Sequence, residues 1–581
     1  MPGFGSLYVG VSGLQTAQDA LNTTAHNLAN VETEGYVRQQ ILQGDKQYNK
    51  IGYASISNMQ VGLGVTLTDV RQVRDEFLDK EYRKETGRAG FYNVCYEAAA
   101  ELEGFFQELD GASYQDCLKE LWQSIAELEK DPSKVDKEYF VLKASEFLQR
   151  SVAINDSIKE YQDNLNLQVV NQINKINELG EKIKYLNDKI VGIELSGVEE
   201  ANDYRDARNQ ALDELSKYAN ISYDTDPEGF VTVKIEGSQF VTRDYVNKMS
   251  YTTDSVTGFH TPIWKHEGNA EVFDLSLEIS TENDTNVGSL KALIMARGDH
   301  HANYTDISSL NQAVKDSVMT DEEAARAYEK NIGYSVVMKV QAEFDQLVHG
   351  VVDMINDALC IDNYSKVDGT NNTQEPPTEL FIRIGEAERY EKKADGSYEI
   401  DGNGYYKQID ECGYLVDDAG NPMLDKNGNY QAVREGATQY NRLYTVGNLM
   451  INPAVLANSS LIKLEQTTGE TDYTIGQLMI QKWNESFATL NPTEEGEMNF
   501  STYYTAMTDS LANQMYVYQG ITEGQQAMAA KTDSARQEIM GVSSDDELTN
   551  MIKFQNAYNA SSRYINVVNE MLEHLLNTLG A

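Results

Sequence analysis

Both ends of the chain carry the same helical pattern, which limits the possible folds more than any other feature of the sequence. Near the C-terminus a stripe of mostly apolar residues steps alternately by three and four positions: Met551, Phe554, Tyr558, Ser561, Ile565, Val568, Leu572, Leu575 and Leu579. The same spacing near the N-terminus joins Leu7, Val11, Leu14, Gln18, Leu21, Ala25 and Leu28. Such a heptad spacing is typical of a helix that packs along a single seam.

Neither terminal helix is expected to be stable alone, because the entropy cost of ordering the backbone nearly cancels the free energy gained by burying one apolar stripe. The simplest partner for each helix is the other one, and the next simplest is a neighbouring molecule. We therefore expect a coiled coil that joins the two ends of the chain. The acidic run after Ser543 and Ser544 suits the start of the C-terminal helix, where either serine can act as the cap.

Helical periodicity also dominates from about residue 75 to 215, and a 3-4 stripe runs from Val169 to Ile190. The period changes to two at Val231, Val233 and Ile235, which begins a β-rich segment. Helix returns between about 288 and 360, with a break at 300–303. Repeated turns followed by tyrosine at 386–440, such as Asp395-Gly396 and Asn403-Gly404, predict short exposed hairpins.

The predicted fold is mainly α with inserted β domains. It has paired terminal helices, a long central helical bundle and β-rich outer domains. The expected domains are a terminal coiled-coil domain (1–40 and 541–581), a helical bundle domain (41–220 with 288–360 and 455–540), a β-rich outer domain (221–287) and a hairpin-rich insertion domain (361–454).

Charge and hydropathy exclude several classes of function. The formal net charge is -43, which disfavours binding to nucleic acid and to anionic membrane surfaces. No stretch approaches the roughly 18 apolar residues of a membrane span, so no membrane insertion is expected. The N-terminus also lacks the features of a cleaved signal peptide. We expect a protein that stays in the cytoplasm or leaves by a route that needs no such signal.

No catalytic, cofactor or metal site is predicted. The seven histidines form no zinc-binding pattern, and His300-His301 are expected at a surface or in a turn. The four cysteines contain no C-x-x-C pair. The stretch that starts at Asp425 begins like a calcium loop, but Tyr430 stands where glycine is needed and Gly436 where glutamate is needed. Phosphate-binding and nucleophile-elbow motifs are also absent from the sequence.

The first helix pattern ends at the stretch NLANVETEGYVRQ (27–39), and this stretch lies within a recognisable signature. Residues 12–39 resemble the N-terminal signature of bacterial flagellar rod, hook and hook-associated proteins, and residues 541–576 resemble the C-terminal one. The matching positions are Ser12, Gly13, Leu14, Ala20, Leu21, Asn27, Asn30, Thr33, Gly35, Tyr36 and Arg38, and then Gln555, Ala557, Tyr558 and Ala560.

Interior segments narrow this resemblance to the hook-associated members. The segments 173–190, 202–216 and 445–457 are similar to such members, whereas rod and hook proteins lack the long helical stretches. Residues of about 300–330 and 386–440 have no counterpart that we recognise. An extra function is expected there if anywhere.

The resemblance implies a structural adapter that joins hook to filament, without catalysis or cofactor. It implies that the terminal helices pair in the inner tube of the flagellum, and that Gly35 redirects the chain after Asn27 and Asn30. Tyr36 and Arg38 then meet neighbouring subunits. The subunit-packing set implied by the signatures and the two seams is Leu7, Val11, Leu14, Leu21, Leu28, Asn27, Asn30, Gly35, Tyr36, Arg38, Met551, Phe554, Gln555, Tyr558, Ile565, Val568, Leu572, Leu575 and Leu579.

The implied location is the extracellular flagellum, reached through the flagellar type III export channel. The implied partners are the hook protein, other hook-associated proteins, further copies of the chain in a ring, and an export chaperone. Two alternatives stay open at this point. One is another rod- or hook-type axial protein, and the other is a filament-displayed enzyme, adhesin or glycan-binding protein that acts through the 386–440 insertion.

Overall fold

The computed structural model describes most of the 581 residues. The described ranges are 2–33, 35–46, 48–50, 60–106, 113–130, 133–195, 200–361, 366–367, 376–383, 390, 393, 395–406, 444–464, 471–494 and 496–579.

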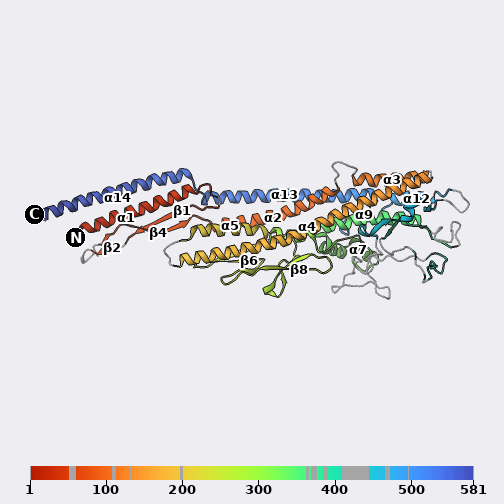
Figure 1. Ribbon diagram of the computed structural model, residues 1–581, viewed down its shortest axis with the longest axis horizontal. Helices are drawn as coiled ribbons and strands as arrows, with labels where there is room; N and C mark the ends of the chain where they lie inside the picture. Colours follow the sequence, from red (N-terminus) through yellow and green to blue (C-terminus); the bar gives the residue numbers. More distant parts are fainter. Residues whose placement is uncertain are drawn as a thin grey trace.

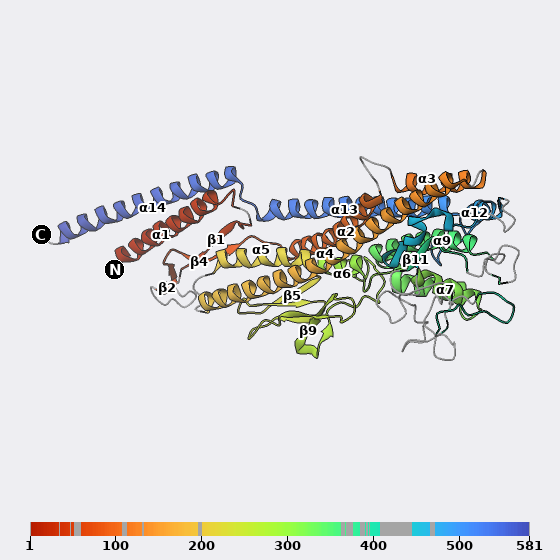
Figure 2. The ribbon, with the colours of Figure 1, turned by 45° about the vertical axis from the view of Figure 1, so that its right-hand side comes forward.

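The molecule is elongated, and both ends of the chain lie together at one end of it (Figure 1). There the first helix, α1 (Pro2–Ala29), lies beside the last helix, α14 (Ser544–Leu579). The two helices remain side by side after the molecule is turned (Figure 2). The predicted pairing of the chain ends is therefore present, and it projects from the rest of the molecule.

A bundle of long helices forms the body of the molecule. Its helices are α2 (Glu76–Phe106), α3 (Tyr114–Lys130), α4 (Lys134–Glu194), α5 (Asn202–Tyr218), α9 (Val336–Leu359), α12 (Thr474–Asn484) and α13 (Phe500–Met540). The sequence explains where α4 starts, because the Ser133 side chain caps it by accepting from the Asp136 amide. The predicted stripe along α4 is buried at Val169, Ile176 and Ile183.

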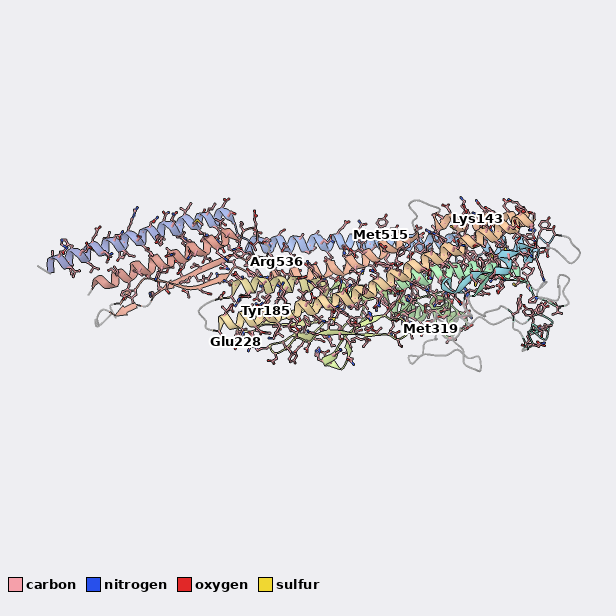
Figure 3. The ribbon with its side chains drawn as sticks, in the orientation of Figure 1. Lys143, Tyr185, Glu228, Met319, Met515 and Arg536 are labelled. Carbon is pink, nitrogen blue, oxygen red and sulfur yellow. The ribbon has the colours of Figure 1, made fainter. Side chains whose placement is uncertain are left out.

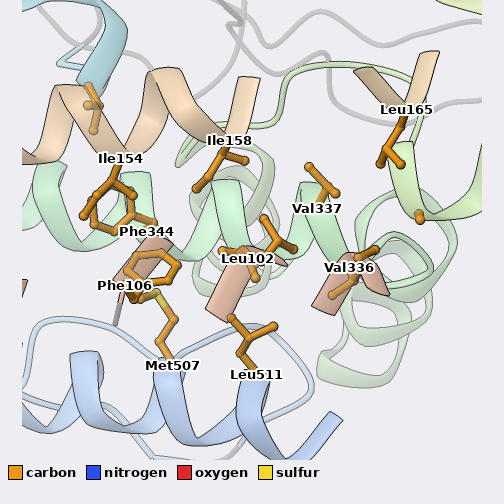
Figure 4. Close-up of a cluster of buried hydrophobic side chains, with 14 of the residues drawn as sticks. Leu102, Phe106, Ile154, Ile158, Leu165, Val336, Val337, Phe344, Met507 and Leu511 are labelled. Atoms are coloured by element: carbon orange, nitrogen blue, oxygen red, sulfur yellow. The ribbon is translucent and has the colours of Figure 1, made fainter. Parts of the chain in front are cut away.

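The core of the bundle is built from apolar side chains of helices that are far apart in the sequence (Figure 4). Leu102 and Phe106 of α2 meet Phe344 of α9 and Met507 of α13. One continuous buried cluster runs from this core to the β-rich segment. The predicted division into four domains stays a prediction, although bundle and sheets share this core.

Two small antiparallel sheets occupy the predicted β-rich segment. One has the order β5-β6-β7 and the other β10-β9-β8. In β6 the expected alternation is confirmed, because Val231, Val233 and Ile235 are buried while the residues between them are only half-buried. The strands are β5 (Ile221–Thr225), β6 (Val231–Ile235), β7 (Ser238–Val241), β8 (Met249–Thr253), β9 (His260–Trp264) and β10 (Ala270–Glu271).

The segment after α1 also forms antiparallel pairs. Strand β1 (Gln39–Asp45) pairs with β4 (Val65–Gln72), and β2 (Tyr48–Lys50) pairs with β3 (Gln60–Gly62). Further along the chain, β11 (Phe381–Arg383) pairs with β12 (Leu449–Ile451). The shorter helical elements near β9 and β12 are η1 (Lys265–Glu267), η4 (Val446–Asn448), α11 (Pro453–Ala457) and η5 (Ser459–Leu461).

The predicted helical segment at 288–360 is broken into several helices. They are α6 (Ser289–Arg297), α7 (Thr305–Lys315), α8 (Asp321–Tyr328), the π-helical turn η2 (Glu329–Gly333) and α9. His300 lies in the turn between α6 and α7, which confirms the prediction of a surface or turn position through the turn, and its side chain is buried there. It is 6% exposed, because its Nε2 contacts Asp306 Oδ2 at 3.2 Å and its Nδ1 contacts Asp299.

Two of the predicted turns in the 386–440 insertion are present. Gly396 and Gly404 have φ angles of 85° and 88°, which favour glycine. The expectation of exposed hairpins is only partly right, since Tyr390 and Tyr406 are each 4% exposed and pack edge to face with Tyr398. The predicted turn at 427–430 and the calcium-like loop lie outside the described residues.

Candidate functional site

The terminal helices run antiparallel to each other. Near the free end of the pair, Gly10 of α1 faces Tyr564 and Ile565 of α14. At the other end of the pair, Asn27 Nδ2 donates to Glu547 Oε2 at 3.3 Å. Ser543 begins α14, because its Oγ accepts from the Asp546 amide at 3.3 Å. The cap that the sequence left open between two serines is thus Ser543.

The predicted stripe of α14 is the face that turns inward. Val568 is 6% exposed, and Met551, Phe554, Tyr558, Ser561, Ile565 and Leu572 are half-buried. One predicted member of the stripe differs, since Leu575 is 52% exposed. Gln555, which the C-terminal signature adds to the subunit-packing set, is exposed, and its contact with neighbouring subunits stays a prediction. The side chain of Leu579 lies outside the described residues.

The predicted seam of α1 is only partly the buried face of that helix. Val11 is 38% exposed, Gln18 and Ala25 are exposed, and Leu7, Leu14, Leu21 and Leu28 are only half-buried. The buried residues are small or polar instead: Gly10, Ser12, Thr16, Ala17, Ala20, Thr24 and Asn27. Their spacing was visible in the sequence, but the larger leucines dominated the pattern.

Small residues on α1 let the larger side chains of α14 come close. A Cβ on Gly10 would lie 2.7 Å from Ile565 Cγ1, and one on Gly13 would lie 2.9 Å from Ser561 Oγ. The spacing of two packed helices is set by the side chains between them, and glycine permits the shortest approach. The bulk at this interface therefore comes from α14, and the space for it comes from α1.

Another face of α1 packs on the strands that follow it. Ser12 Oγ donates to the Val9 carbonyl at 2.9 Å and accepts from the Val65 amide at 3.3 Å. Gly64, with a φ of 105°, lies directly against Ser12, where any side chain would overlap it. The start of β4 is thereby attached to the middle of α1.

Asn27 is the centre of the turn that ends α1. Its Oδ1 accepts from the Tyr36 hydroxyl at 2.7 Å and from the Gln39 amide at 3.0 Å. Its Nδ2 donates to the Gln39 carbonyl at 2.9 Å as well as to Glu547. Asn27 is 1% exposed, and these four bonds satisfy all of its polar capacity.

Asn30 and Gly35 shape the same turn in different ways. Asn30 Nδ2 donates to the His26 carbonyl at 3.0 Å, and its Oδ1 accepts from Thr33 Oγ1 at 3.1 Å. Gly35 has a φ of 77°, so the predicted need for glycine is confirmed. A side chain at this position would also collide with Gln210 of α5.

Tyr36 and Arg38 make polar contacts within their own chain. Arg38 Nε pairs with Glu547 Oε1 at 2.7 Å, and the Arg38 amide donates to the Met540 carbonyl at 2.8 Å. Burial, together with nearby carboxylates, raises the pKa of the Tyr36 hydroxyl, which stays protonated and donates to Asn27. The predicted contact of both residues with neighbouring subunits stays a prediction.

Glu547 was not among the predicted site residues. It is 2% exposed and receives bonds from both Asn27 and Arg38, so it ties α14 to the turn after α1. Its position in the acidic first turn of α14 indicated only a favourable interaction between its carboxylate and the helix dipole. A sequence cannot show that this carboxylate meets a residue that lies 520 positions earlier.

Asp206 of α5 connects the turn and β4 to the bundle. Its Oδ2 accepts from the Val37 amide at 3.2 Å, and its Oδ1 accepts from Gln72 Nε2 at 2.7 Å. Asn202, one turn earlier on α5, donates through Nδ2 to the Val70 carbonyl at 2.9 Å. The segment between the terminal pair and the bundle is thus fixed on α5 by polar contacts.

A buried ion network around Arg536 holds the end of α13 beside this segment. Figure 3 shows where Arg536 lies along the molecule. Arg536 contacts Asp213 of α5 at 2.8 Å and Asp79 of α2 at 3.0 Å, and its guanidinium lies 4.2 Å from the centre of the Tyr82 ring. Arg83 Nε also reaches Asp213, at 2.6 Å. The two arginines and their carboxylates lock α13 onto α2 and α5 just before α14 begins.

The described ranges contain no group of three or more His, Cys, Asp or Glu side chains that could hold a metal ion. Cys95 and Cys117 are free thiols, and burial raises the pKa of the Cys95 thiol to about 12. Among the helices that the structure describes, none has the length and hydropathy needed to cross a bilayer. The chemistry of this region is therefore that of packing and polar attachment.

Three protein-family models match separate parts of the chain. The model described as the flagellar hook-associated protein FlgK helical domain matches residues 99–359. The one described as flagella basal body rod protein matches residues 7–36. The one described as flagellar basal body rod FlgEFG protein C-terminal matches residues 534–578. The last two cover much of α1 and α14, and the first covers most of the bundle and the small sheets.

Relatives that match the chain along nearly its whole length include proteins named flagellar hook-associated protein 1. The chain is 23% identical over 581 residues to flagellar hook-associated protein 1 of Bacillus subtilis (strain 168), and the match covers 98% of each chain. It is 22% identical over 595 residues to the protein of that name from Salmonella typhimurium, again over 98% of each chain. The solved flagellar hook junction protein FlgK of Burkholderia pseudomallei matches with a TM-score of 0.52 and 10% identity. That match covers 80% of this chain and all of the solved chain, and it shows a shared fold.

Proposed function

The chain belongs to the flagellar hook-associated protein 1 family, and we propose that it is the structural adapter that joins the hook of a bacterial flagellum to its filament. The membership rests on family models at both ends and in the interior, and on relatives that match along 98% of the chain. A relative that shared only the terminal helices would support no more than a general axial role.

The observation that carries the proposal is the terminal helix pair, which projects from the body and keeps apolar side chains on its outside. Tyr8 is 64% exposed, Val11 38%, Tyr564 43%, Met571 66% and Leu576 68%. Exposed apolar surface of this kind usually marks a surface for assembly. Further axial subunits that pack against this face would cover it. The exposed Val11 and the half-buried leucines of α1 would then contact those subunits, whereas the pairing with α14 alone leaves them partly open to solvent.

The work of the protein in this proposal is mechanical, without catalysis or cofactor. The partners are the hook protein, other hook-associated proteins and further copies of the chain in a ring. The proposal includes export through the flagellar type III channel with the help of a chaperone, and a final location in the extracellular flagellum. No observation on the described residues favours an enzyme, an adhesin or a glycan-binding role for the 386–440 insertion.

Deleting the gene from its motile host tests the proposal. We expect cells with complete hooks but no filaments, and filament protein that accumulates in the medium, as seen by electron microscopy and by analysis of the culture supernatant. Complementation with the intact gene should restore filaments. Loss of the hook itself would indicate a rod- or hook-type role instead, and normal filaments on the deletion strain would refute the adapter function.

A further inference from the structure

Asp206 is a buried carboxyl group at the connection between the terminal helix pair and the bundle. It is 8% exposed, and it forms no ion pair with any residue that the structure describes. Two neutral donors hold the Asp206 carboxyl group. They are the Val37 amide, in the turn after α1, and Gln72 Nε2, at the end of strand β4. A buried carboxylate without a cationic partner is costly, because water no longer stabilises its charge.

The charged and titratable groups around Asp206 do not remove this cost. Arg74, in the segment before α2, favours the ionised form, but its guanidinium already contacts Asp79. Asp203, one turn earlier on α5, disfavours the ionised form. Tyr36 faces Asp206 from the turn after α1, and its pKa is raised, so it stays neutral. Burial is the largest influence and raises the pKa of Asp206 to about 7.

We propose that Asp206 is a proton-responsive latch between the terminal helix pair and the helical bundle. In its protonated form it holds the turn after α1 and strand β4 on α5. The protonated carboxyl group can still accept both hydrogen bonds, because its oxygens keep free lone pairs. In its ionised form the docked arrangement loses stability, since opening the junction returns the charge to water.

The direction of the pH dependence follows from the two states of the junction. When the junction is open, Asp206 is solvated and titrates near its ordinary value of 3.8, and when it is closed it titrates near 7. The closed state is therefore most stable below about pH 4, and its stability falls as the pH rises towards 7. Within this window the opening constant should rise roughly tenfold per pH unit. Above pH 7 both states are ionised and the opening constant should level off.

Hydrogen exchange of the full-length protein, followed by mass spectrometry, tests the latch. The protection factor of the segment 36–40, corrected for the intrinsic pH dependence of exchange, reports opening at the Val37 amide. In wild type we expect this factor to fall about tenfold between pH 5 and pH 6 and to be constant above pH 7. In Asp206→Asn, which cannot ionise, we expect it to be independent of pH.

Two comparisons assign the effect to Asp206. Asp203→Asn changes a neighbouring carboxylate on the same helix and should keep the wild-type profile. The segment 169–190 of α4 lies inside the bundle, so Asp206→Asn should leave its own pH profile unchanged. The proposal is overturned if wild-type protection at 36–40 does not change between pH 5 and pH 7, or if Asp206→Asn keeps the change. A profile at 36–40 that disappears in Asp203→Asn also overturns it, even if Asp206→Asn does not fold, and so does an α4 profile that Asp206→Asn removes.

Discussion

Gly10 and Ile565 face each other across the pair of terminal helices, and a Cβ on Gly10 would lie 2.7 Å from Ile565 Cγ1. Tyr564 Cδ1 would lie 3.0 Å from the same Cβ, so two side chains of α14 limit the space at Gly10. The glycine is required by the surface of α14 and not by its own backbone, which is helical.

Enlarging Gly10 should therefore disrupt the helix pair. We expect Gly10→Leu to be exported normally but to leave hooks without filaments, because overpacking costs about 1–3 kcal/mol at a contact that cannot relax. Filaments per cell, counted by electron microscopy, and secreted protein provide the measurement. Gly5→Leu is the matched control, since a Cβ on Gly5 has nothing within 4 Å. Equal filament numbers in the two variants would contradict the close approach.

Removing the Asn27 side chain should loosen the turn that ends α1. Asn27→Ala leaves the Gln39 amide without its partner and removes one of the two bonds that Glu547 receives, which costs about 1–3 kcal/mol. The expected result is faster hydrogen exchange at Gln39 by a matching factor. Asn22→Ala, at an exposed position of the same helix, should change the free energy of opening at the Gln39 amide by less than about 0.5 kcal/mol. A smaller effect for Asn27→Ala than for this control would show that the turn does not depend on Asn27.

In the free monomer α14 should be ordered near the junction and frayed towards its free end. Glu547 is buried and bonded, whereas the stripe beyond it is mostly half-buried and Leu575 is largely exposed. Exchange protection should then decrease from Glu547 towards Leu576 and become uniform after assembly. Strong protection along the whole of 550–576 in the monomer would mean that the helix is already docked, and ordering on assembly would have to be abandoned.

A charge at the centre of the α14 stripe should block assembly without unfolding the bundle. Ile565→Asp places a carboxylate against Gly10, and an unpaired charge that becomes buried costs several kcal/mol. We expect this variant to keep its main thermal transition and to fail to retain filaments on hooks. The exposed neighbour provides the control Asn566→Asp, which should behave as wild type. Retained filaments in Ile565→Asp would refute the role of this stripe.

Glu343 of α9 should make the bundle less stable as the pH rises. Burial raises the pKa of its carboxyl from 4.5 to about 7, so its favourable contribution is complete below pH 4.5 and is lost as the pH rises through 7. Glu343→Gln still accepts from Asn491 Nδ2 and cannot ionise. We expect it to raise the free energy of unfolding at pH 8 by about 2–3 kcal/mol and to leave it unchanged at pH 4.

Urea unfolding at the two pH values measures this difference. The surface variant Glu322→Gln, which changes a carboxylate whose side chain is 84% exposed, should have no effect at either pH. A destabilising effect of Glu343→Gln at pH 8 would show that the ionised carboxylate is favoured in the folded protein.

The sequence alone determined the features that depend on neighbouring residues. The α14 stripe, the cap at the start of α4, the alternation in β6 and the glycine conformation at Gly35 all follow from local periodicity, capping or backbone geometry. The terminal signatures indicated a flagellar axial protein, and the interior segments narrowed this resemblance. Each of these signals lies within a short window, so no knowledge of distant partners is needed to interpret it.

Only the tertiary structure decided which face of α1 is buried and which polar residues hold the ends of the chain together. Gly10 and Gly13 occupy the interface in place of Val11, because close packing depends on the fit of two surfaces and not on the size of one. The contacts of Arg536 with Asp213, and of Asn27 with Glu547, join residues 323 and 520 positions apart. Pairing at such separations leaves no local pattern, since each partner alone resembles an ordinary surface residue.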